Sequence, residues 1–254
     1  MNLVINCMQC FHELGHPTEE YRLVEMTNDG LLSSTCSKGH ITLTMLQEQK
    51  FEILFQIASM ALLDGYPREA ITSAAAALER FYEFFINIIC IKNNSKLDDF
   101  EKLWKYVENQ SERQFGAYLF IYYFDKKGSI PPIIDDEKPS ISGISISKTK
   151  KWKEFRNNVV HKGYIPSSNE AFSYMELVFN YINTLIDDIK ENYSDEILKS
   201  VFNYQLKRTK NSDNSTPISS MSIPTIISLN RTSNVSFSES LEALKKYRVN
   251  LHPK

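Results

Sequence analysis

Residues 67–88, PREAITSAAAALERFYEFFINI, form the stretch that decides the fold. Apolar side chains recur there every three or four residues, which is the spacing of one face of an α-helix. Pro67 stands where a helix can begin, because the first turn needs no N–H from that residue. The apolar stripe has small residues at one end and aromatic residues at the other, so another helix is expected to approach its alanine end closely. The stripe consists of Ala70, Ala74, Ala77, Leu78, Phe81, Phe85 and Ile88.

Helical patterns lie on both sides of this stretch. The preceding helix should stop at Asp64-Gly65, and Ser167 with Glu170 forms a capping box that opens a long amphipathic helix. Residues 126–147 form a loop rich in Pro, Gly and Ser, of a length typical of functional or mobile segments. The expected helices cover 46–63, 98–108, 112–124, about 148–163, 167–189 and 195–204. The predicted fold class is mainly α, an antiparallel helical bundle over residues 45–206.

Composition limits the classes of function. The 254 residues carry a formal net charge of -2, and the sequence pI is about 6.2. A uniformly basic surface that coats nucleic acid is thereby excluded, so any contact with RNA must be local. The N-terminal sequence MNLVINCMQC has no basic leader, and no apolar stretch approaches the roughly 20 residues that span a bilayer. We expect a cytoplasmic protein without membrane contact.

The first 44 residues have a β pattern. YRLVEM (21–26) and LLSSTC (31–36) are short extended runs, and the Asn-Asp-Gly sequence between them is a strong turn signal. The pattern predicts a small β-hairpin domain over residues 1–44. Three of the four cysteines lie in this domain, which favours a metal site over disulfides. Cys90 lies in the apolar run FFINIICI and is expected to be a small buried hydrophobe.

The three N-terminal cysteines and one histidine have the spacing of a zinc ribbon. Cys7 and Cys10 form one C-x-x-C pair, and Cys36 with His40 returns a third thiolate and an imidazole after the hairpin. Four such ligands suit tetrahedral Zn²⁺ and leave no open coordination position. The sequence therefore predicts a structural zinc site, whose metal supplies much of the stability of this small domain.

Two alternatives to this ligand set stay open. His16 lies six residues beyond Cys10 and could replace His40, and His12 is also nearby, although pairing with Cys36 favours His40. The other alternative is that three reduced cysteines and a surface histidine lie near one another without a metal.

Residues 148–164, KTKKWKEFRNNVVHKGY, contain the second group of candidate site residues. Arg156 is followed at once by Asn157 and, after three more residues, by His161. An arginine can hold a phosphate through two N–H donors, and a histidine can take up or release a proton near neutral pH. On a helix Asn157 and His161 share a face, whereas Arg156 lies about 140° around the axis from His161. One straight helix therefore does not direct both side chains at one phosphate.

The same stretch is locally basic. We expect its lysines to contact an RNA backbone, although a solvated helix face is the alternative for any run of charges. Trp152 and Phe155, which interrupt the run, are expected to pack inward. The candidate RNA-binding residues are Lys148, Lys150, Lys151, Lys153 and Lys162.

The RNNVVH pattern resembles the signature of the HEPN family, an arginine, often with a polar neighbour, four to six residues ahead of a histidine on a helix. The sequence after it, HKGYIPSSNEA, and the AAAALERFYEFF helix also look like HEPN proteins. The resemblance covers roughly residues 44–204. It implies a HEPN-like helical bundle behind the N-terminal zinc ribbon.

The resemblance also implies a function. The motif is similar to that of HEPN ribonucleases, in which an arginine and a histidine cleave RNA without a metal. The resemblance therefore implies that Arg156, His161 and Asn157 are catalytic residues, and that the products have 2',3'-cyclic phosphate and 5'-OH ends. It further implies a toxin or anti-phage effector, a homodimer in which motifs from two subunits line one cleft, and an antitoxin or phage-derived trigger as partner. Some HEPN toxins have a tyrosine two residues after the histidine. This chain has Gly163 there, followed by Tyr164, so a mechanism through that tyrosine is not expected.

Two other functional classes stay open. One is a non-catalytic HEPN module that binds nucleic acid or a partner protein, and the other is a zinc-ribbon adaptor whose helices only dimerise. Residues 207–254 are expected to be a flexible linker, rich in Ser and Asn, that ends in a short capped helix at 238–247.

Overall fold

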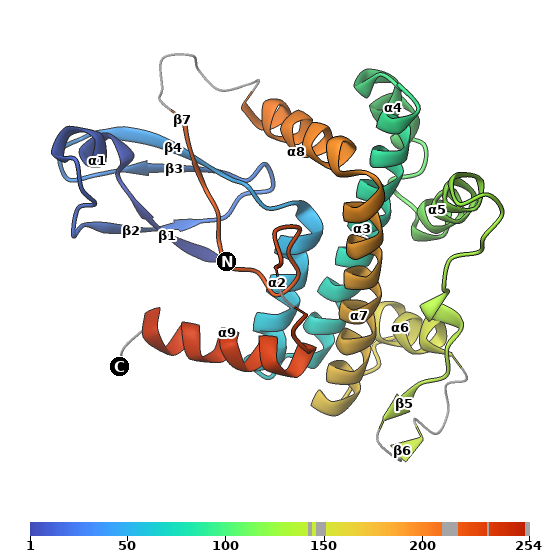
Figure 1. Ribbon diagram of the computed structural model, residues 1–254. Coiled ribbons are helices and arrows are strands. Elements are labelled where there is room, and N and C mark those ends of the chain that lie inside the picture. The colour runs from blue at the N-terminus through green and yellow to red at the C-terminus, as the bar shows by residue number, and fades with distance from the viewer. Residues whose placement is uncertain (142–143, 146–150, 210–217, 233, 252–254) are drawn as a thin grey trace. The chain divides into compact units, whose positions relative to one another are not determined.

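In the computed structural model, α3 (Pro67–Lys92) is one continuous helix with Pro67 in its first turn (Figure 1). Ala70, Ala74 and Ala77 are fully buried, as are Phe81 and Phe85. The predicted apolar stripe is therefore the buried side of this helix. The structure describes residues 1–141, 144–145, 151–209, 218–232 and 234–251.

The chain forms two compact units. We call residues 1–48 with 201–224 the ribbon unit, and residues 49–200 with 225–254 the helical unit. The chain changes from one unit to the other after residues 48, 200 and 224, and the second of these points lies inside α8 (Ser194–Thr209).

The helical unit is arranged around α3, which contacts five other helices, α2, α4, α5, α6 and α7. Aromatic pairs fill the space between them: the Phe51 ring of α2 lies 5.2 Å from that of Phe81, and Tyr118 of α5 stacks on Tyr82 at 4.4 Å. Within the described residues, no helix combines the length and apolar character needed to cross a membrane. The other elements are α2 (Lys50–Leu63), α4 (Leu97–Trp104), α5 (Ser111–Asp125), η1 (Ile134–Asp136), β5 (Ser140–Ile141), β6 (Ile144–Ser145), α6 (Trp152–His161), α7 (Ser168–Asn192) and α9 (Phe237–Leu251).

The turn between α6 and α7 forms as its sequence predicts. Gly163 has φ +71°, a left-handed conformation that a residue with a side chain rarely adopts. Ser167 caps α7 by accepting a hydrogen bond from the backbone N–H of Glu170, whose side chain accepts one from the backbone N–H of Ser167. Both bonds of the predicted capping box are present.

The ribbon unit contains two small sheets. β1 (Asn2–Asn6) pairs antiparallel with β2 (Tyr21–Glu25), and β3 (Leu31–Thr35) pairs antiparallel with β4 (Ile41–Leu46). The predicted hairpin between 21–26 and 31–36 is wrong, because each of those strands pairs with its other neighbour along the chain. The helix expected from residue 46 begins only at Lys50, because β4 occupies the residues up to Leu46.

The predicted linker also differs from the structure. β7 (Ile218–Met221) pairs parallel with β4, so this part of the tail completes a three-stranded sheet. Farther along, the buried side chains of Glu52 and Gln56 in α2 accept hydrogen bonds from the backbone N–H groups of Leu229 and Ile226. The structure confirms a C-terminal helix, α9, whose Phe237 is 1% exposed and packs on Phe55 and Phe179.

We predict that Glu52→Ala destabilises the helical unit by about 2–4 kcal/mol, because it leaves two backbone donors without an acceptor. The two carboxylate oxygens of Glu52 accept from Gln49 N at 2.6 Å and from Leu229 N at 2.8 Å. Denaturant unfolding measures the loss, and limited proteolysis should show faster cutting within 225–232. The exposed Glu69→Ala is the control, with an expected change below about 0.5 kcal/mol. Equal losses in the two variants would contradict the prediction.

Candidate functional site

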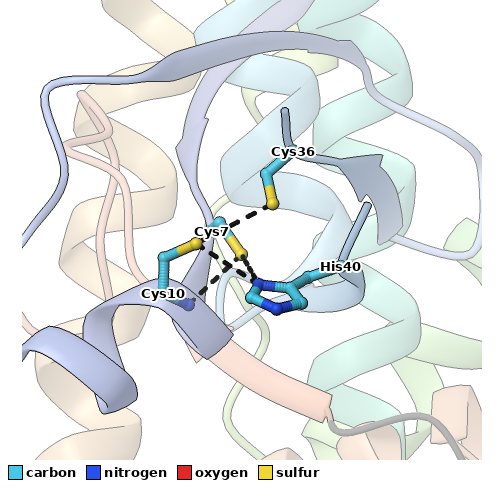
Figure 2. Close-up of side chains that lie close together, drawn as sticks. All are labelled: Cys7, Cys10, Cys36 and His40. Atoms are coloured by element: carbon cyan, nitrogen blue, oxygen red, sulfur yellow. Dashed lines mark hydrogen bonds between the residues drawn. The ribbon is translucent and has the colours of Figure 1, made fainter. Parts of the chain in front are cut away.

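The four predicted metal ligands lie together in the ribbon unit (Figure 2). Cys7 and Cys10 come from the start of α1 (Met8–Leu14), and Cys36 and His40 come from the turn between β3 and β4. Their ligand atoms all lie within 4.8 Å of one another, and the three cysteines are buried. The structure therefore brings together the whole set predicted from the spacing.

Hydrogen bonds that backbone N–H groups donate to nearby residues hold each pair in place. Cys7 is the N-cap of α1, and its Sγ accepts the N–H of Cys10 at 3.4 Å. The second pair sits in a turn closed by hydrogen bonds from Gly39 N to Cys36 O at 3.0 Å and from Cys36 N to His40 O at 3.2 Å. The C-x-x-C pair thus begins a helix, which the β pattern of residues 1–44 did not predict.

The distances fit a tetrahedral metal. With Zn–S bonds of about 2.3 Å, two sulfurs on a tetrahedron lie about 3.8 Å apart, and a sulfur and a nitrogen about 3.5 Å apart. Cys10 Sγ is 3.8 Å from Cys36 Sγ, and His40 Nδ1 is 3.3 Å from Cys10 Sγ and 3.8 Å from Cys7 Sγ. His40 directs Nδ1 at the sulfurs, whereas His12 and His16 are exposed, and His16 Nδ1 lies 3.0 Å from Pro17 O. The alternative ligand sets are therefore not favoured.

Crowding of the three thiols has an electrostatic consequence. Burial and the neighbouring Cys7 and Cys36 raise the pKa of Cys10 to about 12. Burial acts on Cys36 in the same direction, but hydrogen bonds from the backbone N–H groups of His40 and Lys38 outweigh it and lower that pKa. Three thiolates this close repel one another, and a divalent cation among them would remove that repulsion. The donor set and its geometry fit such a cation.

Glu13, which the sequence did not single out, completes the surroundings of His40. It lies on α1 three residues beyond Cys10, and its Oε1 is 3.4 Å from His40 Nε2. A carboxylate behind a ligating histidine fixes the tautomer and the orientation of the ring. The spacing between Cys10 and Glu13 would identify this residue only once the helical form of α1 is known.

The second predicted site lies on α6. Asn157 Oδ1 accepts hydrogen bonds from Arg156 Nε at 3.4 Å and from Nη2 at 3.3 Å. Arg156 Nη1 is 3.6 Å from Asp135 Oδ2, and the side chain of Arg156 is only 12% exposed. Asn157 therefore orients Arg156, its neighbour in the chain, although its spacing predicts that it shares a helix face with His161.

His161 lies in the last turn of α6 and is exposed. Within the described residues, no hydrogen bond or ion pair joins it to Arg156, in agreement with their angular separation on one helix. Tyr164, beyond Gly163, donates a hydrogen bond to Glu170 Oε1 at 2.9 Å, and this bond raises the pKa of Tyr164. The tyrosine is thus part of the turn into α7.

The candidate RNA-binding lysines have different surroundings. Lys148 and Lys150 lie outside the described residues. Lys153 and Lys162 are exposed, whereas Lys151 Nζ is 2.6 Å from Asp136 Oδ1. The interrupting aromatic residues do pack inward, as predicted: Trp152 is 3% and Phe155 1% exposed.

The acidic loop beside α6 differs from its interpretation. A run of three acidic residues in a loop, Asp135 to Glu137, predicts solvated side chains, but the side chain of Asp135 is only 15% exposed and is paired with Arg156. Burial of the Arg156 charge makes a nearby carboxylate favourable, because an unpaired buried cation is costly. Cys90, expected to be buried, is half-buried, and its burial raises its pKa.

Comparison with known proteins adds no relative. No family model, curated protein or solved structure matches the chain. The likeness to HEPN proteins therefore depends on the motif and the order of the helices alone.

We predict that Cys10→Ser abolishes stoichiometric zinc binding and destabilises the ribbon unit, because a hydroxyl replaces a thiolate that the metal needs. Metal analysis of the purified protein measures the first effect, and proteolysis within residues 1–48 measures the second. Cys90→Ser, which changes a cysteine far along the sequence on α3, should keep the metal. Full zinc content and unchanged protease resistance in Cys10→Ser would refute the assignment.

We further predict that Glu13→Gln lowers zinc affinity about tenfold, because an amide orients His40 less strongly than a carboxylate does. Competition with a chromophoric chelator measures the affinity. Glu19→Gln makes the same change of charge at an exposed position of the ribbon unit and is the control. If the two variants bind zinc equally tightly, Glu13 has no role in orienting His40.

Proposed function

We propose that the chain is a metal-independent endoribonuclease of HEPN type. The observation that supports this most is the form of the motif: α6 carries Arg156 fixed by Asn157, and ends with an exposed His161 before a tight turn into α7. A basic helix end that carries an exposed histidine suits cleavage in which the 2'-OH of RNA is the nucleophile. The biological role we infer is that of a toxin or anti-phage effector.

The chemistry needs one group to accept a proton, one to donate a proton and one to stabilise charge. His161 in its neutral form takes the proton of the ribose 2'-OH while the 2'-oxygen bonds to phosphorus. The bond from phosphorus to the 5'-oxygen breaks, and the leaving oxygen takes a proton from a second acid. Arg156 offsets the charge that builds up on the phosphate oxygens. The products are a 2',3'-cyclic phosphate and a 5'-OH end.

A homodimer would supply the second acid. Arg156 and His161 lie about 140° apart on one helix, so α6 alone does not direct both at one phosphate. If two copies of α6 faced one cleft, the His161 of a second copy could protonate the leaving oxygen. The exposed Lys153 and Lys162 would hold the RNA backbone near it.

For the ribbon unit we propose a structural zinc ion on Cys7, Cys10, Cys36 and His40. All four ligands come from the protein, so no position is left for substrate, and the ion has no part in the RNA chemistry. This keeps the two sites separate in any test.

One observation favours a second candidate, a non-catalytic module that binds nucleic acid or a partner protein. Arg156 is only 12% exposed and is paired with a carboxylate, which is also the arrangement of a structural arginine. In that case His161 would be a surface residue without a role in cleavage.

We predict that zinc-loaded wild-type protein cleaves total RNA with no divalent cation added, and that His161→Ala reduces cleavage by at least about a hundredfold. No chelator is used, because it would remove the ribbon metal. Analysis of the cut ends should show 2',3'-cyclic phosphate. His16→Ala, another exposed histidine, is the control and should keep full activity.

Expression in cells gives a second readout. Growth arrest by the wild type and by His16→Ala, but not by His161→Ala, agrees with the ribonuclease. RNA binding without cleavage by a folded, zinc-loaded protein would favour the non-catalytic module instead.

A further inference from the structure

Groups from three elements other than α6 act on the charge of Arg156. Asp135 reaches it from η1, with Oδ2 3.6 Å from Nη1. Glu79 of α3 and Tyr174 of α7 act on its charge through electrostatic interactions. The charge of the motif arginine thus depends on parts of the chain that are far apart in sequence.

The guanidinium group is held from two sides. Asn157 engages Nε and Nη2, and Asp135 engages the remaining nitrogen, Nη1. A planar guanidinium with partners at both ends has little freedom to rotate. An arginine fixed in this way loses less conformational entropy when a phosphate binds it.

Two buried oxygens in this region lack hydrogen-bond partners within the part of the chain that is described. They are Asp135 Oδ1 and the hydroxyl of Tyr174, whose side chain is 0% exposed. A buried polar atom without a partner costs stability, so a residue selected for stability alone would be phenylalanine at position 174. The hydroxyl therefore needs another explanation.

The charges point to the arginine as that explanation. Burial opposes the charge of Arg156, but Tyr174, Asp135 and Glu79 together raise its pKa. Burial raises the pKa of Tyr174, and Arg156 partly offsets that rise. Tyr174 thus keeps its proton, so its hydroxyl stays a neutral polar group, and the carboxylate of Asp135, 3.6 Å from Nη1, favours a charged Arg156 at this place.

We propose that Asp135 and Tyr174 are positioning residues that hold Arg156 in the orientation in which it receives the RNA phosphate. This inference rests on the proposed ribonuclease. Neither residue touches the substrate, and both act through the arginine. Because Asp135 is negative, it adds nothing to the binding of RNA in the ground state. Its contribution should therefore be to kcat, the rate at which bound RNA is cleaved, and not to affinity.

The test compares two isosteric variants with matched controls. Asp135→Asn and Tyr174→Phe should each lower kcat about tenfold and leave KM for a short RNA unchanged or lower. Glu137→Gln removes one negative charge from the same loop at an exposed residue and should keep kcat. Tyr181→Phe removes the hydroxyl of another tyrosine on α7. That hydroxyl does have a hydrogen-bond partner, the Tyr118 hydroxyl at 3.1 Å, so the variant should have a lower melting temperature and an unchanged kcat.

The melting temperature separates positioning from structure. Tyr174→Phe should melt at the same temperature as the wild type or higher, so a fall in its kcat would not reflect loss of fold. An active wild type whose Asp135→Asn and Tyr174→Phe variants keep kcat overturns the positioning role alone. If the wild type cleaves no RNA, or if His161→Ala cleaves RNA as fast as the wild type does, the proposed ribonuclease is overturned and this inference with it.

Discussion

Burial of α3 along most of its length is the constraint on which the helical unit depends. A helix that contacts five others must present apolar atoms on nearly every side, and α3 does so with alanines near its start and aromatic rings farther along. The small alanine side chains let neighbouring helices approach closely, and the aromatic rings fill the wider spaces between helices. An enlarged residue at Ala74 or Ala77 would separate the neighbouring helices at a cost of about 1–3 kcal/mol. The place of α6, and with it the motif, follows from this packing.

The ribbon unit depends on a different kind of interaction. Its sheets are short and its core is small, so buried apolar area alone gives little stability. Two features compensate. The four clustered side chains bring α1 next to the turn between β3 and β4, where a bound metal would cross-link the two, and the chain returns at β7 to add a strand beside β4. Arg208, buried in the same unit, donates hydrogen bonds to Leu46 O and to Tyr204. The ribbon unit is therefore formed both by its N-terminal residues and by the later return of the chain at β7.

The sequence predicts what depends on local pattern and misses what depends on pairing. Helix periodicity, the Ser167 capping box and each of the two pairs of metal ligands are encoded within a few residues, and all of them appear in the structure. The choice of β1 as partner for β2, and of β7 for β4, is not local, because several strands of similar length compete. For the same reason the sequence predicts only that Asp135 lies in a loop, and not that it pairs with Arg156. Its partner Arg156 lies across a loop whose path no periodicity reveals.

The state of Arg156 connects the fold to the proposed chemistry. A buried cation that is paired with Asp135 is satisfied without substrate, so a phosphate has to compete with a carboxylate that is already in place. In the proposed reaction such a site would bind ground-state RNA weakly. It gains only when extra negative charge develops on the phosphate oxygens, because the interaction with Arg156 then exceeds the one it replaces. A partly buried, paired arginine is therefore compatible with catalysis, provided that its donors point at the reacting phosphate, and the loop that bears Asp135 is the element that decides this.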